Sequence, residues 1–208
     1  MILKKKKKNV LIIASNFPPS ERVGGVIRIA KLIKYLPSNN WKPYVITTKR
    51  SQKTKNDSLF NEIKDLCVIY KIPEFDLRKL YHFFNFFRNK SNPFKVIAKP
   101  EKHTIINKES GIPISSHFLV PDHLFIWAII AFFKSIFICI YKKIDVIYAT
   151  SPSQSGLLVG LFLKYFLKIP FVVDLRDPWT TNPFHIKRMF SFLNKFEDRL
   201  ELSVLNKA

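Results

Sequence analysis

The residues best suited to chemistry lie in a short polar loop at the end of the apolar run 171–174. Asp174, Arg176 and Asp177 place two carboxylates and a guanidinium within four residues. Such groups can hydrogen-bond to the hydroxyls of a polar substrate, or they can pair with one another and stiffen the turn. Trp179 follows two residues later, and its ring either offers a stacking face for a sugar or fills the core. The sequence leaves these alternatives open.

A second candidate is the glycine pair Gly24-Gly25, which lies between an apolar run and a helical pattern. A strand, a glycine loop and a helix together let backbone N–H groups approach a phosphate at the helix N-terminus. The alternative is a helix entry that needs an unusual backbone angle. Arg28 is unfavourable against the helix dipole unless an anion lies nearby, so it faces either a phosphate or solvent. The chain has no GxGxxG and no GxxxxGK[ST] sequence, which disfavours classical dinucleotide-binding and P-loop proteins.

The remaining candidates are polar residues close to the ends of predicted strands and helices. Ser151 follows an apolar run, and Asp122 with His117 and His123 lies before a long apolar stretch. The 5 histidines and 2 cysteines show no metal-ligand spacing, so we expect no metal and no cofactor. No Ser-His-Asp or Cys-His nucleophile set can be identified. The two distant cysteines fit a reducing compartment.

A repeated βαβ pattern must position these residues, and it predicts an α/β fold with a Rossmann-like, doubly wound parallel sheet. The predicted strands are residues 9–15, 44–48, 66–70, 145–149 and 171–174. The predicted helices are residues 26–36, 123–142, 156–167 and 186–206, and 49–58 is predicted to be a loop. Ligands of open α/β sheets bind beyond the carboxyl ends of the strands. The loops 16–25, 150–155 and 174–182 should therefore form one rim.

Two of the predicted helices are unusually apolar. Residues 124–140 are almost wholly apolar, and Asp122 is placed to cap this helix. The stretch falls short of the ~20 residues needed to span a bilayer and carries Lys134 near its middle, so a buried or membrane-facing helix is favoured over a spanning one. The helix at 156–167 is apolar nearly all round, and we expect it to be buried.

The net charge of +20 favours anionic partners, although many of the lysines are equally well explained as solvated surface. Lys4 to Lys8 form an uninterrupted basic run, and 76–87 combines crowded aromatic side chains with basic ones. The second segment suits either core packing or an interfacial helix on an anionic membrane surface. Nucleic acid is not an expected partner, because the basic residues are scattered and no known reading motif is present.

The composition and charge pattern divide the chain into three parts. Residues 1–8 form a basic tail, 9–185 form the Rossmann-like domain, and 186–208 form a closing helix. Within the domain, the segment at about 73–120 has no clean periodicity and is predicted to be a long excursion. A content of 47% hydrophobic and 24% charged residues excludes disorder of the whole chain.

Several longer stretches carry a family resemblance. They are FPPS with the following GG-x-x-R, YLPSNNW, PDHLFIW, DVIYATSPSQSGLLVGLFLK and IPFVVDLRDPWTTN. These stretches resemble the N-terminal half of bacterial family 4-like glycosyltransferases, and D-x-R-D-P-W is the most specific match. The closing FEDRLELSVLNKA is similar to the helix that leads into the second domain of these enzymes. The resemblance covers most of the chain and is weakest over about 49–116.

The resemblance implies one half of a GT-B enzyme, in which two Rossmann-like domains face each other across the active site. The N-terminal domain of such enzymes binds mainly the acceptor, and the C-terminal domain binds most of the nucleotide-sugar, which is a co-substrate. Members are metal-independent and retaining, and many build capsule, O-antigen or exopolysaccharide on lipid-linked acceptors. They work in the cytoplasm as peripheral proteins at the inner face of the cell membrane.

The resemblance also assigns residues to the two substrates. Gly24 and Gly25 would lie beside the donor diphosphate, with Arg28 at the position of the family's arginine. The expected acceptor-binding residues are Ser151, Asp174, Arg176, Asp177 and Trp179, with His117, Asp122 and His123 as helpers.

Two departures from the family pattern affect this expectation. Asn40 replaces the usual glycine before Trp41, a mild change because asparagine tolerates the left-handed conformation. The donor-binding domain is not among the 208 residues, and 186–208 would begin the helix that leads to it. We therefore expect a fragment, a frameshifted product, or one subunit that needs a separate C-terminal partner. The alternative is a non-catalytic basic module that binds a membrane surface.

Overall fold

The computed structural model describes residues 6–19, 24–49, 57–74, 120–182, 188 and 190–208, and these form a sheet with helices on both faces. The sheet has five parallel strands in the order β3-β2-β1-β4-β5. They are β1 Lys8–Ile13, β2 Trp41–Thr48, β3 Val68–Ile72, β4 Val146–Thr150 and β5 Phe171–Asp174. This arrangement confirms the prediction of a Rossmann-like α/β fold.

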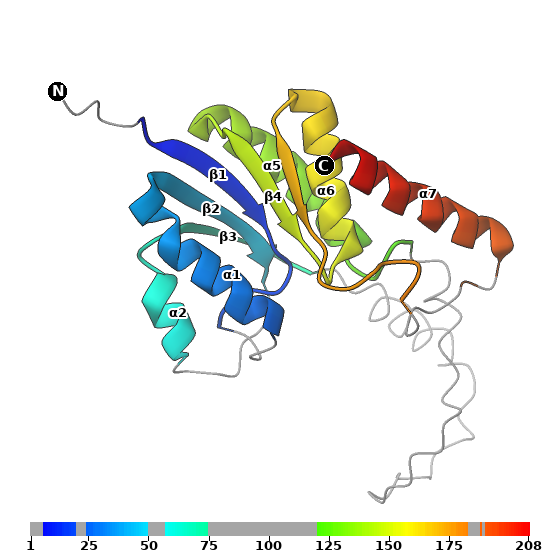
Figure 1. Cartoon of the computed structure of the whole chain (residues 1–208), viewed down its shortest axis with the longest axis horizontal. Coiled ribbons are helices and arrows are strands. Elements are labelled where there is room, and N and C mark those ends of the chain that lie inside the picture. Colours follow the sequence, from blue (N-terminus) through cyan, green and yellow to red (C-terminus); the bar gives the residue numbers. More distant parts are fainter. Residues whose placement is uncertain (1–5, 20–23, 50–56, 75–119, 183–187, 189) are drawn as a thin grey trace, which may run out of the picture.

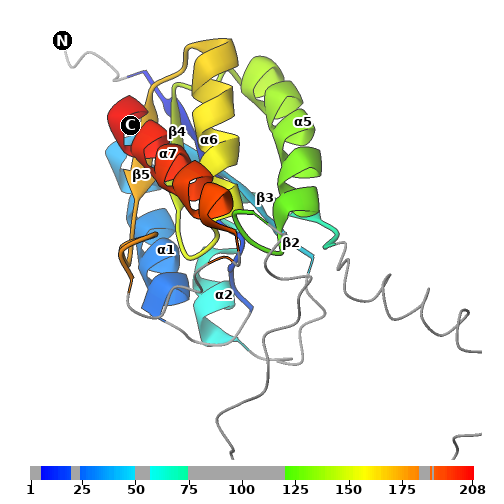
Figure 2. The ribbon, with the colours of Figure 1, turned by 90° about the vertical axis from the view of Figure 1, so that its right-hand side faces the viewer.

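The helices form one layer on each face of the sheet (Figures 1 and 2). The first layer is α1 Gly24–Tyr35 and α2 Ser58–Ile63, and a 3-10 turn, η1 Pro37–Asn39, follows α1. The second layer is α5 Phe125–Lys142, α6 Gln154–Leu167 and α7 Ser191–Lys207. Helices on both faces explain why the central strands are continuous apolar runs instead of alternating ones.

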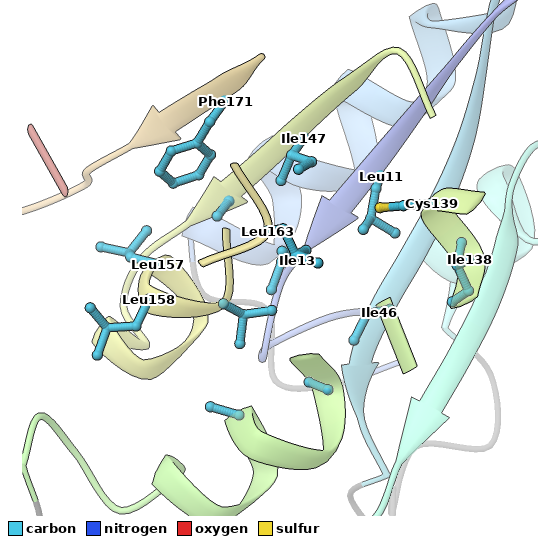
Figure 3. Close-up of a cluster of buried hydrophobic side chains, with 14 of the residues drawn as sticks. Leu11, Ile13, Ile46, Ile138, Cys139, Ile147, Leu157, Leu158, Leu163 and Phe171 are labelled. Atoms are coloured by element: carbon cyan, nitrogen blue, oxygen red, sulfur yellow. The ribbon is translucent and has the colours of Figure 1, made fainter. Parts of the chain in front are cut away.

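β1 is the centre of the core because it pairs with β2 on one side and β4 on the other. Its side chains alternate between the two layers, as the strand period of two requires. Leu11 and Ile13 join the cluster under α5 and α6, and Ile12 joins the cluster under α1. All three are 0% exposed. Figure 3 shows Leu11 and Ile13 among Ile46, Ile147 and Leu163.

Two local signals in the sequence are confirmed. Asn40 has φ 62°, so it supplies the left-handed residue that ends η1 and starts β2. Ser153 precedes α6, and its side chain accepts a hydrogen bond from the N–H of Gly156 at 3.2 Å.

Two features of the helices differ from the expectation. The short helix α2 was not predicted, because six residues are too few to show a helical period; it begins at Ser58, after an Asp57 side chain that accepts from Leu59 N–H at 2.9 Å. The expectation that 156–167 is buried holds only for the first part of α6. Phe162, Tyr165 and Phe166 are 46–67% exposed. α7 contacts α6, but it leaves these three side chains exposed.

The last helix belongs to the layered domain. It was predicted over 186–206; the described helix starts at Ser191 and contacts α6 and β5, and Val204 is buried in the core shared with them. The aromatic helix expected at 76–87 and most of the excursion expected at 73–120 lie outside the described residues.

Candidate functional site

The strand order reverses between β1 and β4, so the loops that follow these two strands diverge and leave a recess at the carboxyl edge of the sheet. Its volume is about 10 Å³, which is room for about one water molecule. The lining residues are Ser15, Asn16, Gly25, Val26, Thr150, Ser151, Pro152 and Arg176. The predicted rim therefore exists, and the first backbone N–H groups of α1 lie on it.

Arg176 covers the glycine pair at the start of α1. A Cβ placed on Gly25 would lie 2.9 Å from Arg176 Nη1 and 3.0 Å from Arg176 Cδ, whereas a Cβ on Gly24 would reach nothing closer than 4.0 Å. Glycine is thus needed at position 25 for Arg176 to keep this place. The Arg176 N–H donates to the Ser151 Oγ at 2.8 Å, which fixes the backbone that carries the guanidinium. A helix N-terminus and a guanidinium are together a suitable environment for an anion.

Asp174 is buried behind the rim, and each of its carboxylate oxygens accepts hydrogen bonds. Arg28 Nη2 lies 2.6 Å from Oδ1, while the Tyr148 hydroxyl at 2.5 Å and the Thr150 hydroxyl at 3.2 Å donate to Oδ2. Asp174 thus holds Arg28, Tyr148 and Thr150 in this structure, and its contact with an acceptor hydroxyl stays a prediction. Arg28 is likewise paired with this carboxylate, although 56% of its side chain is exposed.

The register of β4 and β5 brings this network together. Thr150 pairs with Asp174 across the two strands, and Tyr148 lies two residues earlier on the same face of β4. Burial raises the pKa of the Tyr148 hydroxyl above its usual value, and the hydrogen bond to Asp174 raises it further. Tyr148 therefore stays a neutral donor at physiological pH. Tyr148 and Thr150 were not among the site residues predicted from the sequence. Their spacing of two residues in a strand was a usable signal, because it places both side chains on the same face of β4.

Trp179 fills the core and has no stacking face. The side chain is 1% exposed, and its Nε1 donates to Glu197 Oε1 at 3.2 Å. The backbone N–H groups of Trp179 and Thr180 donate to Glu201 at 3.1 and 3.0 Å. Of the two interpretations of Trp179, the structure favours core packing, because Glu197 of α7 accepts from the indole N–H; acceptor binding by Trp179 stays a prediction.

Glu197 also forms a buried ion pair that fixes α7 to the rest of the domain. Arg188 Nη2 lies 2.9 Å from Glu197 Oε1, and the two side chains are 7% and 1% exposed. The same Nη2 donates to the carbonyl oxygen of Pro121 at 2.6 Å. The ion pair thus links α7 to the turn that precedes α5.

Asp122 has a different partner from the one predicted. Its carboxylate accepts from Leu124 N–H at 2.8 Å, but also from the Ser155 N–H at 3.1 Å, the Ser155 Oγ at 2.6 Å and the Ser153 Oγ at 3.2 Å. The residue flanking the start of α5 is Leu124, so Asp122 acts chiefly at the N-terminus of α6. Asp122 therefore joins the start of α5 to the start of α6, and its role as an acceptor helper stays a prediction.

The structure thus brings together Gly24, Gly25, Arg28, Ser151, Asp174 and Arg176 of the predicted site. Asp177 is exposed on the same loop as Arg176, His123 is exposed in the turn before α5, and His117 lies outside the described residues. Among the described residues, no group of three or more His, Cys, Asp or Glu side chains could hold a metal ion.

Comparison with known proteins gives no family. No protein-family model matches the chain, and no curated protein matches it. The rim itself carries the start of α1, at Gly25 and Val26, and the exposed Arg176 side chain. These groups suit the binding of a phosphate or diphosphate.

Proposed function

We propose that this domain is the acceptor-binding half of a retaining, family 4-like glycosyltransferase. The enzyme would move a sugar from a nucleotide-sugar to a glycan or lipid-linked acceptor in cell-surface polysaccharide synthesis, at the inner face of the cell membrane. The supporting observation is the arrangement at the switch point of the sheet, where Arg176 of the D-x-R-D-P-W loop lies over Gly25. The donor-binding half would be supplied by a C-terminal domain or partner.

In this proposal the rim stabilises the negative charge that develops on the leaving diphosphate. The first N–H groups of α1, at Gly24 and Gly25, would donate to phosphate oxygens, and Arg176 would supply the cation. The sequence assigned that cation to Arg28, but Arg28 is engaged with Asp174, and Arg176 is the guanidinium beside the glycine pair. Ser151 and the exposed Asp177 are the remaining polar residues for the acceptor side.

The metal-independence of the proposed reaction comes from the family resemblance. The donors named above are of the type that stabilises phosphate charge without a metal. The nucleotide-sugar is a co-substrate that spans the cleft, so this half alone should bind it weakly and transfer nothing detectable.

The proposal is tested by NMR titration of the isotope-labelled full chain with uridine diphosphate and, separately, with pyrophosphate. We expect both to shift the amide signals of Gly24, Gly25 and Val26, because these groups start α1. Gly25→Ala should weaken the binding at least tenfold, roughly the cost of losing one charged hydrogen bond, since its Cβ displaces Arg176. Gly24→Ala is the matched control, because its Cβ would lie 4.0 Å from Arg176 Nη2, which is an ordinary contact that displaces nothing.

Two results would contradict the proposal. One is the absence of any shift at the carboxyl edge at millimolar ligand. The other is equal binding by Gly25→Ala, Gly24→Ala and Arg176→Gln, which would remove Arg176 from the proposed role.

A further inference from the structure

The outer side of α5 and α6 exposes an unusual number of large apolar side chains. Ile129, Phe133, Phe137 and Ile140 of α5 and Phe162 and Phe166 of α6 are each 44–62% exposed. We call these six residues the α5–α6 face. Figure 2 shows the two helices side by side on the outside of the sheet. Single exposed apolar residues are ordinary, but a contiguous set of this kind marks a surface that contacts something apolar.

A groove of about 390 Å³ runs between the two helices and is lined almost wholly by apolar side chains. Phe132 lies at its floor, with ring centroids 6.1 Å from Phe162 and 5.8 Å from Phe166. Ser155 borders the groove where α6 begins. The groove therefore starts close to the carboxyl edge of the sheet and extends away from it.

α5 lies along the domain and does not leave it. Among the described residues it is the one helix long and apolar enough to cross a membrane, by length and composition. Its inner side, however, is part of the core: Trp127, Ala131 and Ile138 are at most 4% exposed and belong to the cluster under the sheet. A helix fixed to the sheet in this way can only present its outer side, over a length of about 27 Å.

The two helices of the α5–α6 face and the segments that join them are basic. Residues 124–170 contain five lysines and one acidic residue, Asp145, whose carboxylate accepts from the Asn9 N–H at 2.7 Å. The Asn9 side chain donates to the Lys142 carbonyl oxygen at 2.6 Å. The exposed residues Lys6 and Lys7, just before Asn9, therefore lie near the C-terminal end of α5.

We propose that the α5–α6 face docks on the surface of an anionic lipid bilayer. The apolar side chains would enter the interface while the surrounding lysines contact lipid phosphates, which is the usual design of an interfacial helix. Face-to-face pairing of two copies is disfavoured, because a twofold contact would bring the basic residues of both copies together. The proposal places the membrane contact on described helices, whereas the sequence offered the segment 76–87 as one candidate for it. It does not depend on sugar transfer.

The first test is co-sedimentation of the full chain with phosphatidylcholine vesicles that contain phosphatidylglycerol. The double substitution Phe133→Gln with Phe137→Gln should weaken binding at least tenfold, roughly the effect of removing two partly inserted aromatic side chains. Tyr35→Gln is the matched control, because Tyr35 is 61% exposed on α1, across the sheet, and should bind as the unmodified chain does. Binding should also fall between about 0.1 M and about 0.5 M salt and be much weaker without phosphatidylglycerol. Thermal melts followed by circular dichroism confirm that the variants fold.

The second test measures contact directly. Phe137→Trp adds a fluorophore to the α5–α6 face and Tyr35→Trp adds one to α1. With brominated acyl chains in the same vesicles, we expect the added emission to be quenched for Phe137→Trp and unchanged for Tyr35→Trp.

Three outcomes would overturn the proposal. The first is unchanged vesicle binding by the double variant, and the second is equal quenching of the two tryptophan variants or quenching of neither. The third is a dimer in gel filtration that the double variant dissociates while vesicle binding stays the same, which would make this face a contact between copies of the chain.

Discussion

The Asp174 network gives the most direct test of how the rim is held together. Removing the carboxylate in Asp174→Ala leaves the Tyr148 and Thr150 hydroxyls without their acceptor and frees Arg28. Hydrogen bonds to an ionised group contribute about 1.5–3 kcal/mol each, but Arg28 is half exposed and regains water, so we expect a loss of roughly 3–4 kcal/mol in the free energy of unfolding. Tyr148→Phe should cost roughly 2 kcal/mol, because it removes one donor to the same carboxylate.

The decisive quantity is the coupling between the two substitutions. Both substitutions remove the 2.5 Å hydrogen bond between Tyr148 and Asp174. The double variant should therefore lose less free energy of unfolding than the two single variants lose together. We expect a coupling energy of about 1–2 kcal/mol.

Urea denaturation followed by circular dichroism measures all four proteins of the cycle. Tyr141→Phe is a matched control at an 80% exposed position of α5 and should change the stability by less than about 0.5 kcal/mol. A coupling energy below about 0.3 kcal/mol would refute the reasoning, since that is the additivity expected of independent sites. The hydrogen bond would then contribute nothing to holding Asp174.

The remaining predictions concern packing and titration. Gly160→Ala should destabilise the domain by about 1–2 kcal/mol in urea unfolding, because its Cβ would lie 2.3 Å from a buried phenylalanine ring of β5; Gly156→Ala, whose nearest neighbour is at 3.7 Å, should be neutral or stabilising. Burial raises the pKa of Cys67 to about 11 and of Cys139 to about 12, so neither thiol should react with iodoacetamide at about pH 8 until urea unfolds the chain; rapid labelling of the native protein would contradict this. The pKa of Tyr148 is raised in the folded state, so its contribution to stability is complete below the unfolded value of about 10 and is lost as the pH rises above it; the stability difference from Tyr148→Phe should therefore shrink above about pH 10.

The central part of the fold could be predicted because its signals are local. The apolar run of β5 was predicted at its observed bounds, since Pro170 precedes it and the polar loop follows Asp174. The left-handed turn at Asn40 needs only one residue to be recognised. These signals depend on residues that are neighbours in the chain, so no tertiary information was required.

The partners of individual polar residues could not be predicted in the same way. Asp122 precedes an apolar stretch and was expected to cap it, but it meets Ser155, 33 residues later. Trp179 had two open interpretations, and the choice between them depends on Glu197 of α7. Sequence patterns give the type of a side chain but not which of several donors will reach it. The Tyr148–Asp174 contact was missed for the same reason, since the register that brings β4 beside β5 is seen only in the structure.

The loop that carries Arg176 is secured by α7, a helix that follows it in the chain. Glu201 binds the backbone of Trp179 and Thr180, and Glu197 binds the indole. During synthesis the strands of the sheet leave the ribosome before this last helix does, and the loop that carries Arg176 has none of these hydrogen bonds until α7 follows. The loop that carries Arg176 is thus held in place by the part of the described chain that is made last.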